Sequence, residues 1–104
     1  MIEQEEVEAL KAKHGDLTRV ALEDVTILLR KPTRAEFKAF RLAAQNDARR
    51  GNATEELAKR IVVYPGTVQE LEAVFDRFPA LEDVVSGEAV KLAGGGATAD
   101  VKKL

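Results

Sequence analysis

The chain offers few side chains for catalysis. His14 is the only histidine, Ser86 is the only serine, and cysteine is absent. Serine catalysis needs a hydroxyl poised beside a base, as in a G-x-S-x-G turn, whereas Ser86 lies in a stretch with helical spacing. A metal site would depend on carboxylates, and the sequence contains no D-x-D-x-D-G loop. We therefore expect no enzyme, no catalytic residues, no metal and no other cofactor.

The clearest electrostatic feature is a basic stripe. It comprises four cations spaced for one sector of a helix, at Arg34, Lys38, Arg41 and Arg49. Such a stripe could bind an acidic protein or a nucleic-acid backbone, and the alternative is a solvated flank whose aliphatic stems cover the edge of the core. The formal net charge is −2, so the rest of the surface would repel the phosphates of nucleic acid or an anionic membrane. An acidic protein helix is therefore the favoured partner, and binding to nucleic acid or to a membrane is not expected.

Aromatic residues are sparse, and each could belong either to the core or to a partner-binding groove. The candidates are Phe37, Phe40, Tyr64, Phe75 and Phe78. Most of the core must then come from Leu, Val, Ile and Ala, within a chain of only 104 residues. Small domains with such cores often gain stability from self-association, so a homo-oligomer is expected.

The elements that position these residues begin with a short helix and a hairpin. Glutamates ahead of lysines in residues 2–13 indicate an additional N-terminal helix, which would be marginal by itself. Alternating apolar residues predict an N-terminal β-hairpin over about residues 17–30. Its centre, Glu23-Asp24, lacks a turn glycine, so a longer or bulged connection is expected.

Three capping-box spacings, Thr33/Glu36, Asn52/Glu55 and Thr67/Glu70, introduce the helices that follow. The first should run to about Arg50 and present one apolar face made of Phe37, Phe40, Ala44 and Ala48. The second should continue toward Tyr64, although residues 61–64 could instead form a strand.

The third helix places Val68, Leu71, Phe75 and Phe78 on one side, and a final helix should span about Ala80 to Ala93. The predicted fold is therefore α+β and mainly α, with the hairpin followed by four short helices. Residues 1–15 would form an acidic helix or arm, residues 16–94 a single helical domain with the hairpin, and residues 95–104 a flexible tail.

Four segments of the chain resemble the small tail assembly chaperones of long-tailed bacteriophages. They are Leu29–Phe40 with its P-x-x-x-E-aromatic helix start, Glu56–Pro65, Phe78–Leu81 and Val90–Gly94, and the resemblance covers about residues 25–94. It implies a non-catalytic protein of the host cytoplasm, present during phage assembly and absent from the mature virion. Its implied partners are the tape measure protein and the tail-tube protein.

Two other functions stay open at this point. The chain could be a small structural head-tail or tail component that is retained in the virion, or a nucleic-acid-binding regulator that uses the basic stripe. The acidic N-terminus lacks the features of a signal peptide, no stretch is long and apolar enough for a membrane span, and the absence of cysteine fits a reducing cytoplasm.

Overall fold

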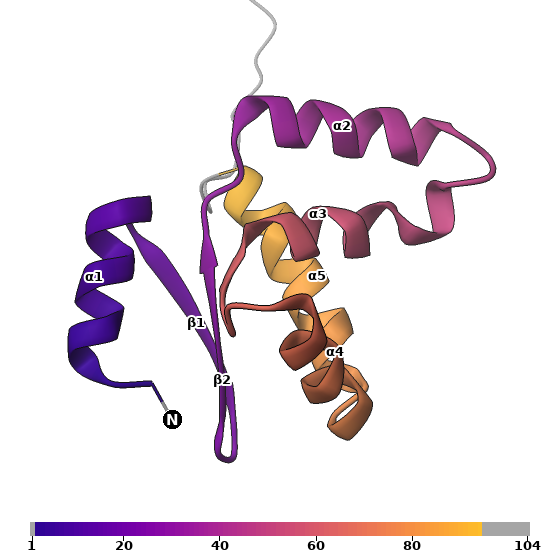
Figure 1. Ribbon diagram of the computed structural model, residues 1–104. Helices are drawn as coiled ribbons and strands as arrows, with labels where there is room; N and C mark the ends of the chain where they lie inside the picture. The colour runs from indigo at the N-terminus through magenta and orange to yellow at the C-terminus, as the bar shows by residue number, and fades with distance from the viewer. Residues whose placement is uncertain (1, 95–104) are drawn as a thin grey trace, which may run out of the picture.

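A computed structural model describes residues 2–94 of the chain, and Figure 1 shows the arrangement of the elements. The fold is α+β and mainly helical, as predicted, with five α-helices and three strands in these residues. In chain order the elements are α1 (Gln4–His14), β1 (Leu17–Leu22), β2 (Val25–Arg30), α2 (Arg34–Gln45), a 3-10 turn η1 (Arg50–Asn52), α3 (Ala53–Ile61), β3 (Val62–Tyr64), α4 (Val68–Arg77) and α5 (Ala80–Ala93). The tail predicted at 95–104 lies outside the described residues.

The predicted hairpin is confirmed, but its turn is tighter than expected. β1 and β2 pair antiparallel from Leu17 opposite Arg30 to Leu22 opposite Val25, so Glu23 and Asp24 alone make the connection. Glu23 replaces the missing glycine by adopting a left-handed conformation, with φ 53°. Arg77 of α4 binds the Asp24 carboxylate at 3.0 Å and thereby holds the turn against the helical layer.

Replacing Glu23 by glycine is expected to raise the free energy of unfolding by about 0.5–1 kcal/mol, because glycine adopts positive φ without a steric penalty. Urea unfolding monitored by circular dichroism measures the change. Ala21→Gly, an exposed change within β1, is the matched control and should lower stability by about 0.5–1 kcal/mol. If Glu23→Gly lowered the free energy of unfolding as much as Ala21→Gly does, the left-handed conformation of Glu23 would carry no strain.

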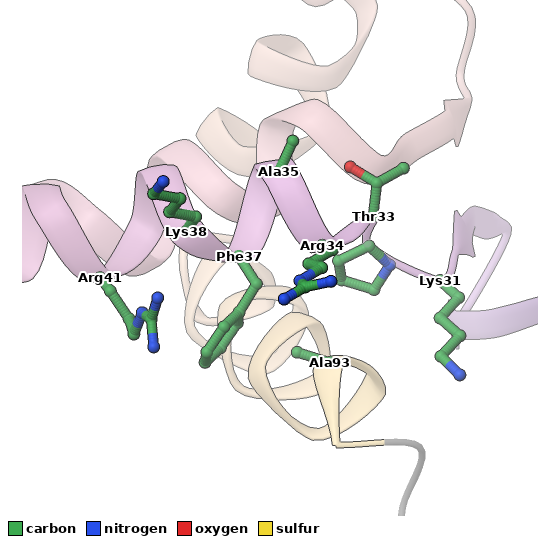
Figure 2. A pocket seen from close by; sticks show the side chains of 9 residues that line it. Lys31, Thr33, Arg34, Ala35, Phe37, Lys38, Arg41 and Ala93 are labelled. Carbon is green, nitrogen blue, oxygen red and sulfur yellow. The ribbon is translucent and has the colours of Figure 1, made fainter.

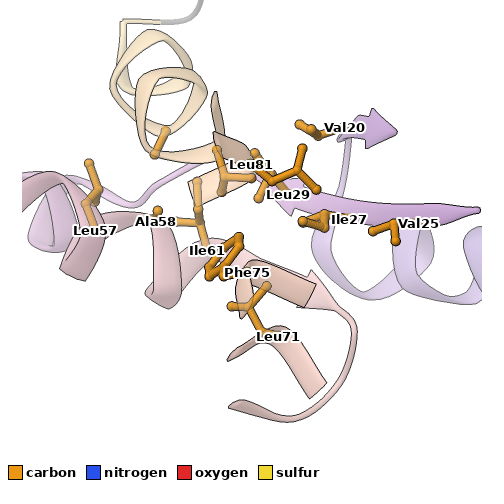
Figure 3. Packing of buried hydrophobic residues seen from close by; sticks show 12 residues of the cluster. Val20, Val25, Ile27, Leu29, Leu57, Ala58, Ile61, Leu71, Phe75 and Leu81 are labelled. Carbon is orange, nitrogen blue, oxygen red and sulfur yellow. The ribbon is translucent and has the colours of Figure 1, made fainter. Parts of the chain in front are cut away.

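The hydrophobic core joins one face of β2 to α3, α4 and α5 (Figure 3). β2 is the central strand of the sheet, between β1 and β3, and its residues Ile27 and Leu29 are fully buried. Ile61 at the end of α3 and Val85 in α5 are equally inaccessible, and Phe75 of α4 is 7% exposed. Aliphatic side chains thus dominate the core, as the composition predicts.

All three predicted helix starts are confirmed, and capping hydrogen bonds form at two of them. Thr33 and Glu36 form a complete box, in which each side chain binds the other residue's backbone N–H. Thr67 accepts a hydrogen bond from the Glu70 amide. At Asn52 the predicted helix start is confirmed, because Asn52 is the N-cap of α3, but the predicted capping box is wrong: the side chain makes no capping hydrogen bond, and the 3-10 turn η1 leads into the helix.

The prediction that the first of these helices reaches Arg50 is also wrong, because α2 ends at Gln45. Asn46 adopts an extended conformation, and its side-chain oxygen accepts hydrogen bonds from the amides of Ala48 and Arg49 at 2.9 and 3.2 Å. A short polar side chain of this kind competes with the helical hydrogen bonds. Ala48 therefore leaves the predicted apolar face and is exposed.

Two further expectations need correction. Helix α3 stops at Ile61, and Val62–Tyr64 forms strand β3 against β2, which is the alternative that the sequence favoured less. Val68 does not face the core with Leu71 and Phe75, because it is the first residue of α4 and is 64% exposed.

Helix α1 lies apart from the other helices. The hairpin separates it from α3, α4 and α5 (Figure 1), and Val7 is its only buried residue. The additional N-terminal helix is thus present, but little of its surface is covered within the described part of the chain.

Candidate functional site

The first turns of α2 form one wall of an open hollow of about 820 Å³, and Ala93 at the end of α5 contributes to the opposite side. We call this hollow the cationic groove. Its charged lining residues are Lys31, Arg34, Lys38 and Arg41, and its apolar lining includes Pro32, Phe37 and Ala93. Figure 2 shows Phe37 directed toward the turn of α5 that carries Ala93, with Arg34 and Arg41 on either side of it.

The spacing of the cations explains why they line one groove. Arg34, Lys38 and Arg41 are separated by four and three residues, so they lie on one side of α2. Lys31 extends the row from the connection between β2 and α2. Within residues 2–94, no salt bridge joins any of the four to an acidic side chain. The groove therefore presents positive charge that the described part of the fold does not neutralise.

A largely shielded ion pair fixes the start of α2 and hence one end of the groove. Arg30 donates two hydrogen bonds of 2.7 Å to the Glu36 carboxylate and a third, of 2.9 Å, to the backbone oxygen of Arg60. The hydrogen bonds from Arg30 lower the pKa of Glu36 to about 2, and those from Thr33 act in the same direction. This one guanidinium joins β2, α2 and α3.

The basic stripe predicted from the sequence is only partly formed. Arg34, Lys38 and Arg41 share the cationic groove, but Arg49 does not belong to it. Because α2 ends at Gln45, Arg49 lies in the following turn, where it forms a 2.9 Å ion pair with Glu56 of α3. Ala93 could not be anticipated as a wall of the groove, because no local pattern connects it with α2.

The five aromatic candidates do not gather in one place. Phe37 lines the cationic groove, whereas Phe40 packs against the core, with a ring centroid 5.4 Å from that of Phe37. Tyr64 lines a second, smaller hollow of about 280 Å³ beside the hairpin turn. Phe75 is buried, and Phe78 packs against the core with the Arg77 guanidinium 4.8 Å above its ring. Their predicted role in binding stays a prediction, and only Phe37 lies beside the basic side chains of the groove.

The remaining chemical candidates are dispersed. His14 ends α1, and Ser86 lies in α5 with its hydroxyl buried and without a hydrogen-bond partner in the described structure. Residues 2–94 contain no group of three or more His, Asp or Glu side chains arranged to hold a metal ion. None of the helices in this range is long and apolar enough to cross a membrane.

Comparison with known proteins gives a structural neighbour of unknown function. No family model matches the chain, and no curated protein matches it. Among solved structures, an uncharacterised protein from Bacillus stearothermophilus is similar, with a TM-score of 0.68 and 19% sequence identity over 92% of this chain and 99% of that chain. At this identity the likeness concerns the fold alone.

Proposed function

We propose that this chain is a non-catalytic assembly chaperone that binds an acidic, amphipathic helix of a longer client protein. By the sequence resemblance, the client is the tape measure protein of a long-tailed phage, and the chaperone acts in the host cytoplasm and is absent from the finished particle. The observation that carries the proposal is the cationic groove, where an apolar ring and four cations without acidic partners in residues 2–94 face the same open space.

The chemistry of the groove fits a helix better than an extended peptide or a small metabolite. A bound helix can place apolar residues against Phe37 and acidic residues one turn away against Arg34, Lys38 or Arg41. Two of the segments that carry the resemblance, Leu29–Phe40 and Val90–Gly94, contain residues from both walls of this groove. Covering the apolar face of a long helix would keep it from aggregating before the tail tube assembles.

The test is coexpression with the tape measure protein encoded in the same phage or prophage genome. The wild-type chain is expected to keep that protein in the soluble fraction and to copurify with it. The variant Arg34→Gln/Lys38→Gln/Arg41→Gln should weaken binding about three- to a hundredfold, since each of the three exposed ion pairs contributes about 0.2–1 kcal/mol. Titration of the purified proteins by calorimetry measures the difference.

The matched control removes three exposed cations outside the groove, through Arg19→Gln/Arg50→Gln/Arg60→Gln, and should bind as the wild type does. Equal binding by both triple variants would contradict the proposal. Recovery of the chain from purified virions would favour a structural head-tail or tail component. DNA binding that depends steeply on salt and is lost in the Arg34→Gln/Lys38→Gln/Arg41→Gln variant would favour a nucleic-acid-binding regulator.

A further inference from the structure

The first half of α1 has a charge opposite to that of the groove. Four glutamates, Glu3, Glu5, Glu6 and Glu8, are exposed within or just before its first turns. Within residues 2–94 none of them forms a salt bridge, and Glu8 only accepts a hydrogen bond from Gln4. We call residues 3–8 the acidic arm. Four negative charges on the arm thus match the four positive charges of the groove in number.

The exposed side of α1 is also shaped for contact with another surface. At 100° per residue, Glu5, Ala9 and Ala12 lie opposite Val7, the one residue that α1 buries. Alanine allows close approach of a neighbouring surface, so this side could lie against the ring of Phe37 while the glutamates meet the cations around it. The arm therefore offers the acidic and small apolar groups that the groove is suited to bind.

Within one molecule the two surfaces are far apart. α1 runs toward the end of the hairpin where α2 begins, so its acidic N-terminal half lies at the other end of the hairpin, away from the groove (Figure 1). The arm could reach its own groove only by leaving its place beside the hairpin. The arm of another molecule can reach the groove without any rearrangement.

We propose that α1 of one protomer binds in the cationic groove of a second copy, in a head-to-tail arrangement. Each protomer then keeps one free arm and one free groove, so the contact can repeat along a chain of copies or close into a ring. The contact between two copies requires only the acidic arm and the cationic groove. A second consequence rests on the proposed function: the arm of a neighbouring copy occupies the groove until an acidic client helix displaces it.

Two complementary variants test the contact in solution. The arm variant Glu5→Gln/Glu6→Gln/Glu8→Gln keeps a native groove, and the groove variant Arg34→Gln/Lys38→Gln/Arg41→Gln keeps a native arm. By analytical ultracentrifugation in 50 mM NaCl, the wild type should form species larger than a dimer as its concentration rises. Each variant alone should stay at the monomer mass of 11.4 kDa. An equimolar mixture should form a dimer and nothing larger, because only one native arm and one native groove can meet.

Controls separate this contact from other modes of association. The variant Asp47→Asn/Asp76→Asn/Asp83→Asn, which removes three exposed acids outside the arm, should associate as the wild type does. Raising NaCl to 0.5 M should weaken association about tenfold, because salt screens exposed charges. Circular dichroism establishes that the variants are folded. A monomeric wild type, variants that associate as the wild type does, or a mixture that stays monomeric would each overturn the proposal.

The outcome is independent of the client experiment. A monomeric wild-type protein that still binds the tape measure protein would remove the head-to-tail contact and leave the proposed function intact. A protein that assembles through arm and groove but does not bind the tape measure protein would remove the proposed function and leave the head-to-tail contact intact. If both proposals hold, adding the tape measure protein should convert the wild-type assemblies into complexes of the chain with that client. The self-associated species should then become smaller.

Discussion

Replacing Ile61 by alanine is expected to lower the free energy of unfolding by about 3 kcal/mol, the middle of the range for large-to-small changes in cores. Ile61 is fully buried at the junction of α3 and β3, and Figure 3 shows it beside Ala58 and Phe75. Truncation would leave a cavity where the helical layer meets the sheet. For a domain of this size the midpoint of thermal unfolding should fall by about 10–20 °C.

Val68→Ala is the control for this prediction. The sequence pattern places Val68 on the same apolar side as Leu71 and Phe75, but it is 64% exposed in the structure. Its replacement should change stability by about 0.5 kcal/mol or less. Urea unfolding of the two variants measures both values. A loss for Val68→Ala as large as that for Ile61→Ala would mean that the first turn of α4 faces the core after all.

The contrast between Ile61 and Val68 illustrates what a sequence pattern can determine. Alternation in residues 17–30 predicted both strands of the hairpin because each strand's side chains must divide between two faces. The capping box at Thr33 predicted the start of α2, since both of its hydrogen bonds lie within four residues. Signals of this kind are local, and at these two places the structure follows them.

The errors arise where a local signal competes with another interaction. Ala48 continues the helical spacing of the apolar face beyond Gln45, but the side chain of Asn46 binds the following amides and ends α2 there. Residues 62–64 leave the helix because β2 offers its second edge for pairing, and that edge is brought close only by the tertiary fold. The sequence pattern allows the strand as an alternative but favours the helix, and it does not predict the end of α2 at Gln45.

The cationic groove likewise combines features that local sequence predicts with features that depend on tertiary packing. Three of its cations and Phe37 are predictable as neighbours because they lie within eight residues on one helix. The opposite wall at Ala93 depends on how α5 packs, and the exclusion of Arg49 depends on where α2 ends. The charge pattern could therefore be predicted, whereas the shape that makes it a groove could not.

The second large effect is expected at Glu36. Its ordinary pKa of 4.5 is lowered to about 2 in the folded chain, mainly by the hydrogen bonds from Arg30. A carboxyl group whose pKa falls on folding stabilises the fold above its unfolded pKa, and this contribution disappears as the pH falls toward the folded value. The shift corresponds to about 3 kcal/mol at neutral pH. Glu36→Gln should remove this stabilisation, because glutamine has no charge to pair with Arg30.

The pH dependence distinguishes the ion pair from a general packing defect. Wild type and Glu36→Gln should differ by about 3 kcal/mol at pH 7, and the difference should shrink between about pH 4.5 and pH 2 as Glu36 becomes protonated. Other carboxylates titrate in both proteins, so the difference isolates this one. Glu56→Gln, which removes the partner of Arg49 in a pair with 51% and 40% exposed side chains, should lower stability by less than about 1 kcal/mol. If the two variants were equally stable at pH 7, the Arg30 pair would be no stronger than a surface pair, and another interaction would have to fix the start of α2 and the end of the groove.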